Sequence, residues 1–280
     1  MKVVTLIENN SDSSELKSEH GLSLYIETPK YKILFDTGQT DAFIHNAKHL
    51  QIDLKNIDIV IISHGHYDHI GGLLSFFEIN TKAKVYLKKE IFDYHYSALK
   101  NLMYKNISYS SHLLNYSNRF HYIDTFTELE DLVFIPYFTK YFKTPMGNSI
   151  LFRTDNTGLT EHDTFNHELV FAIKLNEKSL IVFTGCAHSG LLNILSSTRN
   201  LLQDYSIRAV IGGFHLIDSE YSVETESNEE LQDIALGLQK LLGKESWFYT
   251  GHCTGKHAFE ILTSHCKTIK KINTGTILNF

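Results

Sequence analysis

The chain contains few cysteines and no long apolar run. Its three cysteines, Cys186, Cys253 and Cys266, are an odd number in 280 residues, which is not typical of a disulfide framework. No apolar stretch approaches the roughly 20 residues that a membrane-spanning helix needs, and the first residues lack the apolar segment of a signal peptide. We therefore expect a cytoplasmic protein that does not enter a membrane.

Excess positive charge is absent as well. The formal net charge is −6 at pH 7, so no strongly basic face is expected and nucleic acid is an unfavoured partner. No low-complexity segment or short repeat divides the chain. With 42% hydrophobic residues the chain can bury a substantial core. We expect one domain over residues 1–280 that acts on a small molecule, and the sequence carries no signal for an oligomeric state.

Histidine, by contrast, is abundant, with 16 copies. Three of them stand with one aspartate in a single short stretch, as His64, His66, Asp68 and His69. The stretch follows residues 57–62, an apolar and β-branched run that predicts a buried strand. Imidazole and carboxylate are good ligands for zinc and for other first-row metals. The spacing therefore predicts a metal site on the loop after this strand.

Strand-like and helix-like segments alternate on both sides of this cluster, an order that fits layered α/β packing. Apolar and alternating runs predict strands at 3–8, 22–28, 31–35, 57–62, 84–87, 169–175, 179–184, 209–216 and 247–250. Helical spacing of apolar residues predicts helices over 40–50, from 73, from 191, over 231–242 and over 258–263.

The middle of the chain, at about residues 88–130, is rich in aromatic side chains. The spacing from Phe92 to Tyr104 favours a helix, so we expect a helical, aromatic-rich insert. Two roles are open for it. Its aromatics either join the core as an ordinary amphipathic insert, or they form a lid or pocket wall against an organic substrate.

Metal-type side chains recur at predicted strand ends in the second half. Cys186 and His188 follow one strand, His215 ends another, and His252 follows a third. Strand ends at one edge of an α/β sheet converge in space and often form ligand crevices. We therefore expect these side chains to meet the cluster at 64–69.

The pattern His-x-His-x-Asp-His at 64–69 resembles that of the metallo-β-lactamase superfamily, and the order of the later motifs is similar over nearly the whole chain. One branch contains archaeal dihydropterin-ribofuranosylaminobenzene phosphate synthases and many bacterial hydrolases of unknown substrate. The motifs that resemble this branch are Glu19–Ser23, Leu34–Gly38, Gly185–Gly190, Gly212–Leu216 and His252–Gly255. The resemblance implies an α/β fold, the αβ/βα four-layer sandwich of two mixed β-sheets.

The resemblance also implies a set of ligands. His64 and His66 would bind one ion with a later histidine, for which we favour His188. Asp68 and His69 would bind a second ion with a final histidine, for which we favour His252. Asp36, at the end of an early strand, would support the metal-binding histidines from behind.

The bridging aspartate that the superfamily places at the end of a second-half strand is missing, because that strand ends in Thr184-Gly185-Cys186. Either Cys186 coordinates as a thiolate, or it is a buried thiol and His188 reaches the metal. His167 stands where many relatives place the third histidine. His215 is an alternative to His252 as a ligand, or a proton donor.

These residues predict a metal-dependent hydrolase with two divalent ions, Zn²⁺ as the first choice and Mn²⁺ or Fe²⁺ as alternatives. Bound metal would activate a water against a small-molecule ester, phosphoester or related bond. Asp68 would orient the nucleophile or accept its proton, and His215 would protonate the leaving group. Two alternatives remain open, a pterin or phosphate-ester synthase of the same fold and a non-catalytic metal-binding protein. The candidate phosphate binders are Lys88, Lys89, Arg153 and Lys256, although for each of them we favour a solvated position at the surface.

Overall fold

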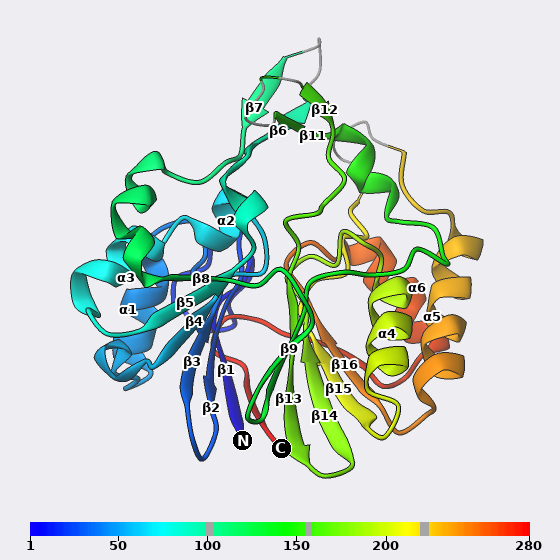
Figure 1. The fold of residues 1–280 in the computed structure, drawn as a ribbon. Helices are drawn as coiled ribbons and strands as arrows, with labels where there is room; N and C mark the ends of the chain where they lie inside the picture. Colours follow the sequence, from blue (N-terminus) through cyan, green and yellow to red (C-terminus); the bar gives the residue numbers. More distant parts are fainter. Residues whose placement is uncertain (99–102, 155–157, 159, 219–223) are drawn as a thin grey trace.

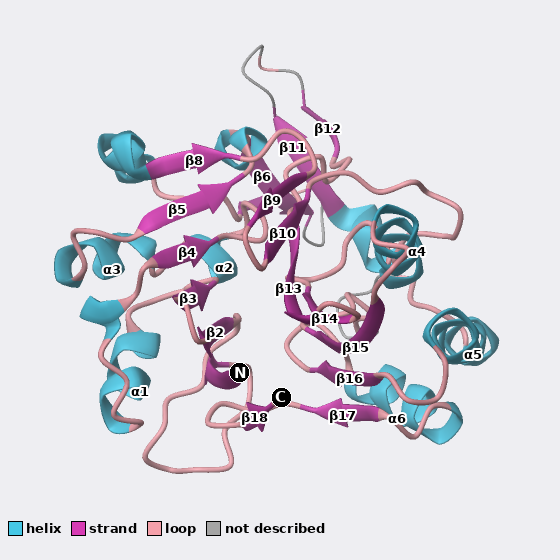
Figure 2. Cartoon of the chain, turned by 60° about the horizontal axis from the view of Figure 1, so that its bottom comes forward, coloured by secondary structure: helices cyan, strands magenta, loops and turns pink. Residues whose placement is uncertain are grey.

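The computed structural model describes residues 1–98, 103–154, 158, 160–218 and 224–280. Two seven-stranded sheets face each other, and helices cover the outer face of each (Figure 1). Viewed from below, the strands lie in the middle and the helices on both flanks (Figure 2). The predicted αβ/βα four-layer sandwich is therefore confirmed. None of the helices within the described ranges is both long and apolar enough to cross a membrane.

The first sheet has the order β18-β1-β2-β3-β4-β5-β8. Its strands are β1 (Lys2–Ile7), β2 (Ser23–Glu27), β3 (Lys32–Phe35), β4 (Ile59–Ile61), β5 (Lys84–Leu87), β8 (Phe120–Tyr122) and β18 (Ile277–Asn279). Pairs from β18 to β3 are antiparallel and pairs from β3 to β8 are parallel. The helices of this half are α1 (Ala42–His49), α2 (Tyr67–Ile70) and α3 (Leu73–Ile79).

The second sheet has the order β17-β16-β15-β14-β13-β10-β9. Its strands are β9 (Thr127–Leu129), β10 (Leu132–Ile135), β13 (Val170–Asn176), β14 (Ser179–Phe183), β15 (Ser206–Ile211), β16 (Trp247–Thr250) and β17 (Ile269–Lys271). Pairs from β17 to β14 are parallel and pairs from β14 to β9 are antiparallel. The helices of this half are α4 (Leu191–Leu201), α5 (Asn228–Leu242) and α6 (Lys256–His265).

The core has three parts, one between the sheets and one under each helical layer. In β3, Phe35 points into the central core, where it packs on Phe171 with ring centroids 5.1 Å apart, while Leu34 packs under the helices. In β4, Ile61 and Val60 divide in the same way. Both faces of these strands are buried, which is why their sequences read as continuous apolar runs.

The helices and strands predicted outside the insert are present with shifted ends, and the strand predicted at 57–62 spans only Ile59–Ile61. The strand predicted at 209–216 ends at Ile211 as β15. The backbone turns at Gly212, which has φ 144°, and a Cβ there would overlap the carbonyl oxygen of Thr184. The turn brings His215, with φ 51°, to the edge of the sheet.

The prediction of a helical insert at about 88–130 is wrong in its secondary structure. β6 (Tyr94–Ala98) and β7 (Tyr104–Asn106) pair with each other, and β6 also pairs with β11 (Leu151–Thr154), which pairs with β12 (Thr160–His162). This four-stranded sheet, β12-β11-β6-β7, stands above the two main sheets (Figure 1). Residues 99–102, part of the expected helix, lie outside the described residues. The helical turns that the structure describes in this stretch are 3₁₀ segments, η2 (Lys89–Phe92) and η4 (Ser111–Arg119).

Candidate metal centre

Loops at the carboxyl ends of parallel strands from both sheets meet at one edge of the sandwich. Asp36 follows β3, and residues 64–69 follow β4 and enter α2. From the second sheet, Cys186 and His188 follow β14, His215 follows β15 and His252 follows β16. The aspartates, histidines and cysteine among these residues are all buried, with at most 9% of each residue exposed. The structure therefore brings together the residues that the sequence placed in one site.

The first group within this site contains His64, His66 and His188. One ring nitrogen from each lies within 4.8 Å of the others. The ring centroids of His64 and His66 are 4.6 Å apart, and those of His64 and His188 are 5.0 Å apart. The Nε2 atoms of all three rings are buried and have no hydrogen-bond partner among the described residues. Such unpaired imidazole nitrogens are available as metal ligands.

The second group contains Asp68, His69 and His252. The Nε2 atoms of His69 and His252 are 3.0 Å apart, and Oδ2 of Asp68 lies 3.2 Å from Nε2 of His252 and 3.7 Å from Nε2 of His69. These separations suit ligands that share one ion at bond lengths of about 2.0–2.2 Å.

Hydrogen bonds behind the rings fix which nitrogen of each histidine faces the site. Oδ2 of Asp36 accepts hydrogen bonds from Nδ1 of His69 at 2.7 Å and from Oγ of Ser63 at 2.7 Å. Ser63 Oγ in turn accepts from Nδ1 of His64 at 2.8 Å. Asp36 is fully buried. In the neutral form of either ring, the proton is therefore on Nδ1, and Nε2 offers its lone pair to the site.

Two asparagines do the same for the histidines of the second half. His188 donates from Nδ1 to Oδ1 of Asn148 at 2.9 Å, and His252 donates from Nδ1 to Oδ1 of Asn9 at 3.0 Å. The lone pairs of His69, His252 and Asp68 thus converge with no proton between them when the rings are neutral, which is an arrangement that a cation satisfies.

Cys186 lies between the two groups. Its Sγ is 3.2 Å from Nε2 of His69, and it forms ligand-sized sets with His64 and His69 and with His188 and His215. Burial raises the pKa of the Cys186 thiol, and Cys253 acts in the same direction. The position is that of a bridging group, but the side chain becomes a thiolate only beside a cation.

His167 and His215 occupy different positions from those of the two groups. Nδ1 of His167 accepts a hydrogen bond from the Gly65 amide at 2.9 Å, and its Nε2 lies 3.2 Å from Oδ2 of Asp163. Both of its ring nitrogens are occupied behind the loop, whereas Nε2 of His188 is free. His215 packs on His188 with ring centroids 4.1 Å apart, and neither of its ring nitrogens has a partner within the described chain.

His20 is a residue of this site that the sequence did not assign. Its Nε2 is 3.2 Å from Oδ2 of Asp68, and its ring centroid is 4.9 Å from that of His252. About half of its side chain, 52%, is exposed, in contrast to the buried groups around it. Only the resemblance had singled out the segment Glu19–Ser23, and no spacing connects His20 with the cluster at 64–69.

The protonation states of the site suit metal binding. Burial and the neighbouring histidines hold the pKa values of His64, His66 and His188 well below the usual range. Burial alone would raise the pKa of Asp68, but His69 and the hydrogen bonds from histidine outweigh it and lower that pKa well below its usual range. These three neutral imidazoles and the ionised carboxylate are in the forms that divalent metals require. Asp36 and Asp68 outweigh burial and raise the pKa of His69, so an ion bound there would compete with a proton. This donor set fits zinc and other first-row metals.

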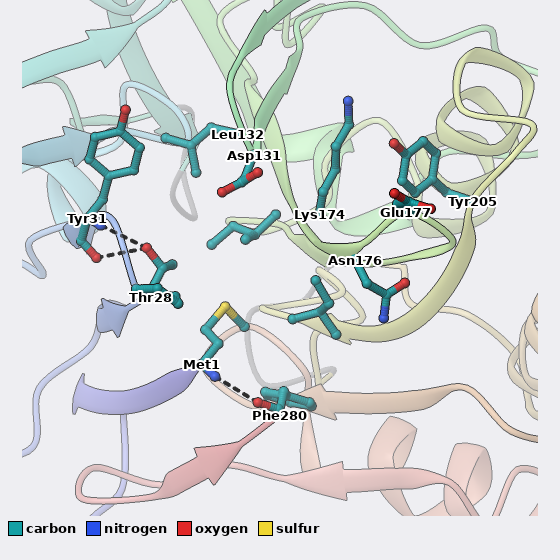
Figure 3. Close-up of a pocket in the computed structure, with 13 residues that line it drawn as sticks. Met1, Thr28, Tyr31, Asp131, Leu132, Lys174, Asn176, Glu177, Tyr205 and Phe280 are labelled. Atoms are coloured by element: carbon teal, nitrogen blue, oxygen red, sulfur yellow. Dashed lines mark hydrogen bonds between the residues drawn. The ribbon is translucent and has the colours of Figure 1, made fainter.

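A cavity of about 540 Å³ lies elsewhere, at the opposite end of the strands. Figure 3 shows it between the turn at Thr28–Tyr31 and the turn at Asn176–Glu177, close to Met1 and Phe280. It contains none of the clustered histidines. We therefore place the candidate chemistry at the histidine edge and not in this cavity.

Comparisons with known proteins agree with this geometry. Residues 18–157 match the metallo-beta-lactamase superfamily. The chain is 31% identical over its whole length to 97% of a 7,8-dihydropterin-6-methyl-4-(beta-D-ribofuranosyl)-aminobenzene-5'-phosphate synthase of Methanocaldococcus jannaschii. It is 30% identical to a solved metal-dependent hydrolase of the beta-lactamase superfamily, with a TM-score of 0.83 and coverage of 100% of this chain and 99% of that one.

A more distant structure, the short form of human tRNase Z, shares the fold. Its TM-score is 0.57 at 11% identity, with coverage of 100% of this chain and 99% of the tRNase. The full-length relative, the match over half of the chain and the shared architecture all point to one family. The chain belongs to the metallo-β-lactamase superfamily.

Proposed function

We propose that this protein is a metal-dependent hydrolase that holds two divalent ions, with Zn²⁺ as the first choice. The observation that carries the proposal is the convergence of histidine ring nitrogens and one carboxylate from both sheets at a single buried edge, with the Nε2 atoms of His64, His66 and His188 unpaired among the described residues. The first ion would be held by His64, His66 and His188. The second would be held by Asp68, His69 and His252. Cys186 would stand between them in place of the usual aspartate.

The chemistry follows from the residues around these positions. Bound divalent ions lower the pKa of a coordinated water and polarise the oxygen of a carbonyl or phosphoryl group. Asp68, an ionised member of the second group, would orient the nucleophile or accept its proton. His215 packs beside His188 with both ring nitrogens unpaired among the described residues, and it would hold the proton for the leaving group. Asp36 would keep His69 and, through Ser63, His64 in the required tautomer.

The substrate class we favour is a small ester, phosphoester or related molecule. A 30% identical neighbour of the same fold is a metal-dependent hydrolase, which supports hydrolysis. Two of the four candidate phosphate binders are already engaged: Lys88 is buried and donates to the carbonyl of Pro136, and Arg153 pairs with Asp93 and Glu161. Lys89 and Lys256 are exposed.

A synthase is the second candidate function, because the full-length relative at 31% identity is a synthase whose product name contains a dihydropterin and a ribose phosphate. The two candidates share the metal site and differ in the acceptor. A hydrolase transfers a group from its substrate to water, whereas a synthase joins two organic substrates.

Metal analysis tests the shared part of the proposal. We expect purified protein, after dialysis against Zn²⁺ or Mn²⁺, to hold about two equivalents of metal, in line with the two ligand groups. Less than about half an equivalent, with no gain on adding either metal, contradicts the proposal, because structural and catalytic sites of this kind bind their ions tightly.

A substrate panel then separates the candidates. Phosphodiesters, cyclic phosphates and pterin phosphates are compared with lactones and thioesters, with and without a second organic acceptor. Turnover in water alone supports the hydrolase, and a product formed only with the acceptor supports the synthase. Tight metal binding with no turnover in either format favours a non-catalytic metal-binding protein.

A further inference from the structure

A second group of buried polar side chains lies directly behind the loop at 64–69. It consists of His95 on β6, Asp163 just after β12, and His167 just before β13. All three are buried. Oδ2 of Asp163 lies 2.9 Å from Nδ1 of His95 and 3.2 Å from Nε2 of His167. One ring nitrogen of His66 lies within 4.8 Å of ligand-type atoms of all three.

The hydrogen bonds of this group determine where its protons are. Nδ1 of His167 accepts from the Gly65 amide, so its proton is on Nε2 and points to Asp163. Burial alone would raise the pKa of Asp163, but His167 and His95 outweigh it and lower that pKa well below its usual range. Asp163 is therefore a carboxylate that accepts from Nδ1–H of His95. The Nε2 atom of His95 is left with a free lone pair.

This lone pair faces the metal loop without a partner. Nε2 of His95 is buried and unpaired within the described residues. It lies so close to the loop that a Cβ at Gly65 would be 2.8 Å away from it. A buried polar atom without a partner costs about 1–3 kcal/mol, so a donor is expected nearby.

Among the histidines of the two ligand groups, His66 is the one for which the described residues supply no partner behind the ring. No ring hydrogen bond of His66 is present among the residues that the structure describes, and its Nε2 is buried and unpaired. The other rings of the two groups each donate from Nδ1. Their acceptors are Ser63 for His64, Asp36 for His69, Asn148 for His188 and Asn9 for His252. When one nitrogen of His66 binds an ion, the other carries a proton that needs an acceptor.

We propose that His95 is the positioning residue for His66. In the metal-loaded protein the free ring N–H of His66 donates to Nε2 of His95, and Asp163 holds His95 in the tautomer that can accept. The chain Asp163–His95–His66 then fixes the first ion, and this inference rests on the metal site proposed above. It also gives the four-stranded sheet a function, because β6 carries His95 to the back of the metal loop.

The test compares metal binding in three variants and the wild type. His95→Phe removes the acceptor and keeps a flat ring, whereas His95→Gln keeps an acceptor oxygen. His162→Gln is the matched control, because His162 is an exposed histidine of the same small sheet. Zn²⁺ affinity is measured by chelator competition for each ion, Co²⁺ absorption reports the coordination geometry, and thermal unfolding of the metal-free forms reports the fold.

We expect His95→Phe to weaken binding of one of the two ions by about 10–100-fold, the usual effect of losing an outer partner, and to alter the Co²⁺ spectrum. His95→Gln should recover most of that affinity, and His162→Gln should match the wild type. Wild-type affinities and spectrum in His95→Phe overturn the inference. The inference is also overturned if His95→Phe loses affinity for both ions equally and its metal-free form melts at a lower temperature, because that result indicates a structural role.

Two further outcomes keep the tests separate. A wild type that binds no metal overturns the proposed function itself. If the wild type binds metal and His95→Phe binds it equally well, only the inference is overturned. A third equivalent of metal that is lost in His95→Phe overturns it in favour of an ion held by His95, Asp163 and His167.

If His95→Phe does not fold, ¹⁵N spectra of histidine in the zinc-loaded wild type decide. A proton on Nδ1 of His95 with a hydrogen-bonded Nε2 supports the relay, and a proton on Nε2 overturns it.

Discussion

At the scale of single residues, Asp36 supports a histidine in each of the two proposed ligand groups. It is fully buried, contacts His69 directly and reaches His64 through Ser63, so one carboxylate orients a ring in each ligand group. Asp36→Asn replaces an acceptor of two side-chain protons by an amide that also donates. We expect metal affinity to fall by about 10–100-fold, as for other outer partners of metal ligands.

Isothermal titration with Zn²⁺ checks this prediction, with Asp41→Asn as the control. Asp41 is exposed, and within the described part of the chain its side chain makes no capping hydrogen bond at the start of α1. The Asp41 variant should bind like the wild type. Equal metal affinity of Asp36→Asn and the wild type would show that the rings keep their orientation without the carboxylate.

Cys186 carries the second prediction at this scale. If its sulfur coordinates between the ions, Co²⁺-substituted protein should show a thiolate-to-metal charge-transfer band, because a coordinating thiol is deprotonated. Cys186→Ser should lose the band, and Cys186→Asp should restore metal affinity with a bridging carboxylate. Cys266→Ala is the control, since Cys266 packs in the core beside α6. A wild type without the band would make Cys186 a buried thiol and not a ligand.

The sequence could place some of these residues and not others, for a physical reason. Asp36, His188 and His252 each follow a strand, so strand prediction and motif order bring them to one edge. Asn9 and His252 are 243 positions apart in sequence, and His95 and Asp163 are 68 apart. Such contacts depend on how loops pack, and no local period records them.

At the scale of elements, the insert shows where periodicity fails. Phe92, Tyr94 and Tyr96 are two positions apart, as on one face of a strand, yet the aromatic run as a whole also satisfies helical spacing. The structure has a strand here, β6, and not a helix. Its side chains alternate, since His95 points inward to Asp163 while its neighbour Tyr94 is 48% exposed. The long amphipathic helices have one clear period, and their prediction is confirmed.

The turn after β15 carries a prediction at this scale. A Cβ at Gly212 would overlap the carbonyl oxygen of Thr184, so Gly212→Ala must separate the ends of β14 and β15. We expect a stability loss beyond the roughly 1–3 kcal/mol that a residue other than glycine costs in a sparsely populated backbone conformation, together with lower activity as His215 shifts.

Gly243→Ala provides the matched control, because Gly243 has φ 83° and a Cβ added there would meet no atom within 4 Å. Both variants place alanine at a positive φ, whereas only Gly212→Ala also creates the steric clash, so urea unfolding of the two variants shows how much the clash adds. Equal losses in the two variants would mean that the strand ends can move apart freely.

At the scale of the whole molecule, each ligand group joins the two halves. His64 and His66 come from the first half and His188 from the second, while Asp68 and His69 meet His252 across the same boundary. A ligand that binds only the folded state stabilises it by mass action. Bound metal should therefore raise the melting temperature of the entire sandwich. Without metal, the stability of the protein should depend on the protonation of the histidines between the two halves, which we call the seam.

The pH dependence of the metal-free protein tests this coupling. Burial lowers the pKa of His167 to about 4 and holds those of His64, His66 and His188 well below the usual range. These histidines bind protons in the unfolded chain, at a pKa of about 6.5, before they do so in the folded one. Their contribution to stability is thus present above pH of about 6.5 and is lost as pH falls toward about 4.

His69 acts in the opposite sense, so the balance of groups decides the sign. Burial opposes its charged form, but Asp36 and Asp68 together outweigh burial and raise the pKa of His69. Its contribution is largest at low pH and fades as pH rises through the raised pKa. His69 is one group against the four histidines with lowered pKa. The melting temperature of chelator-treated protein should therefore fall steadily from pH of about 7 to about 4.5, and it should fall less in His167→Gln. A flat profile would mean that the rings are already solvated, and hence that the metal-free seam is open.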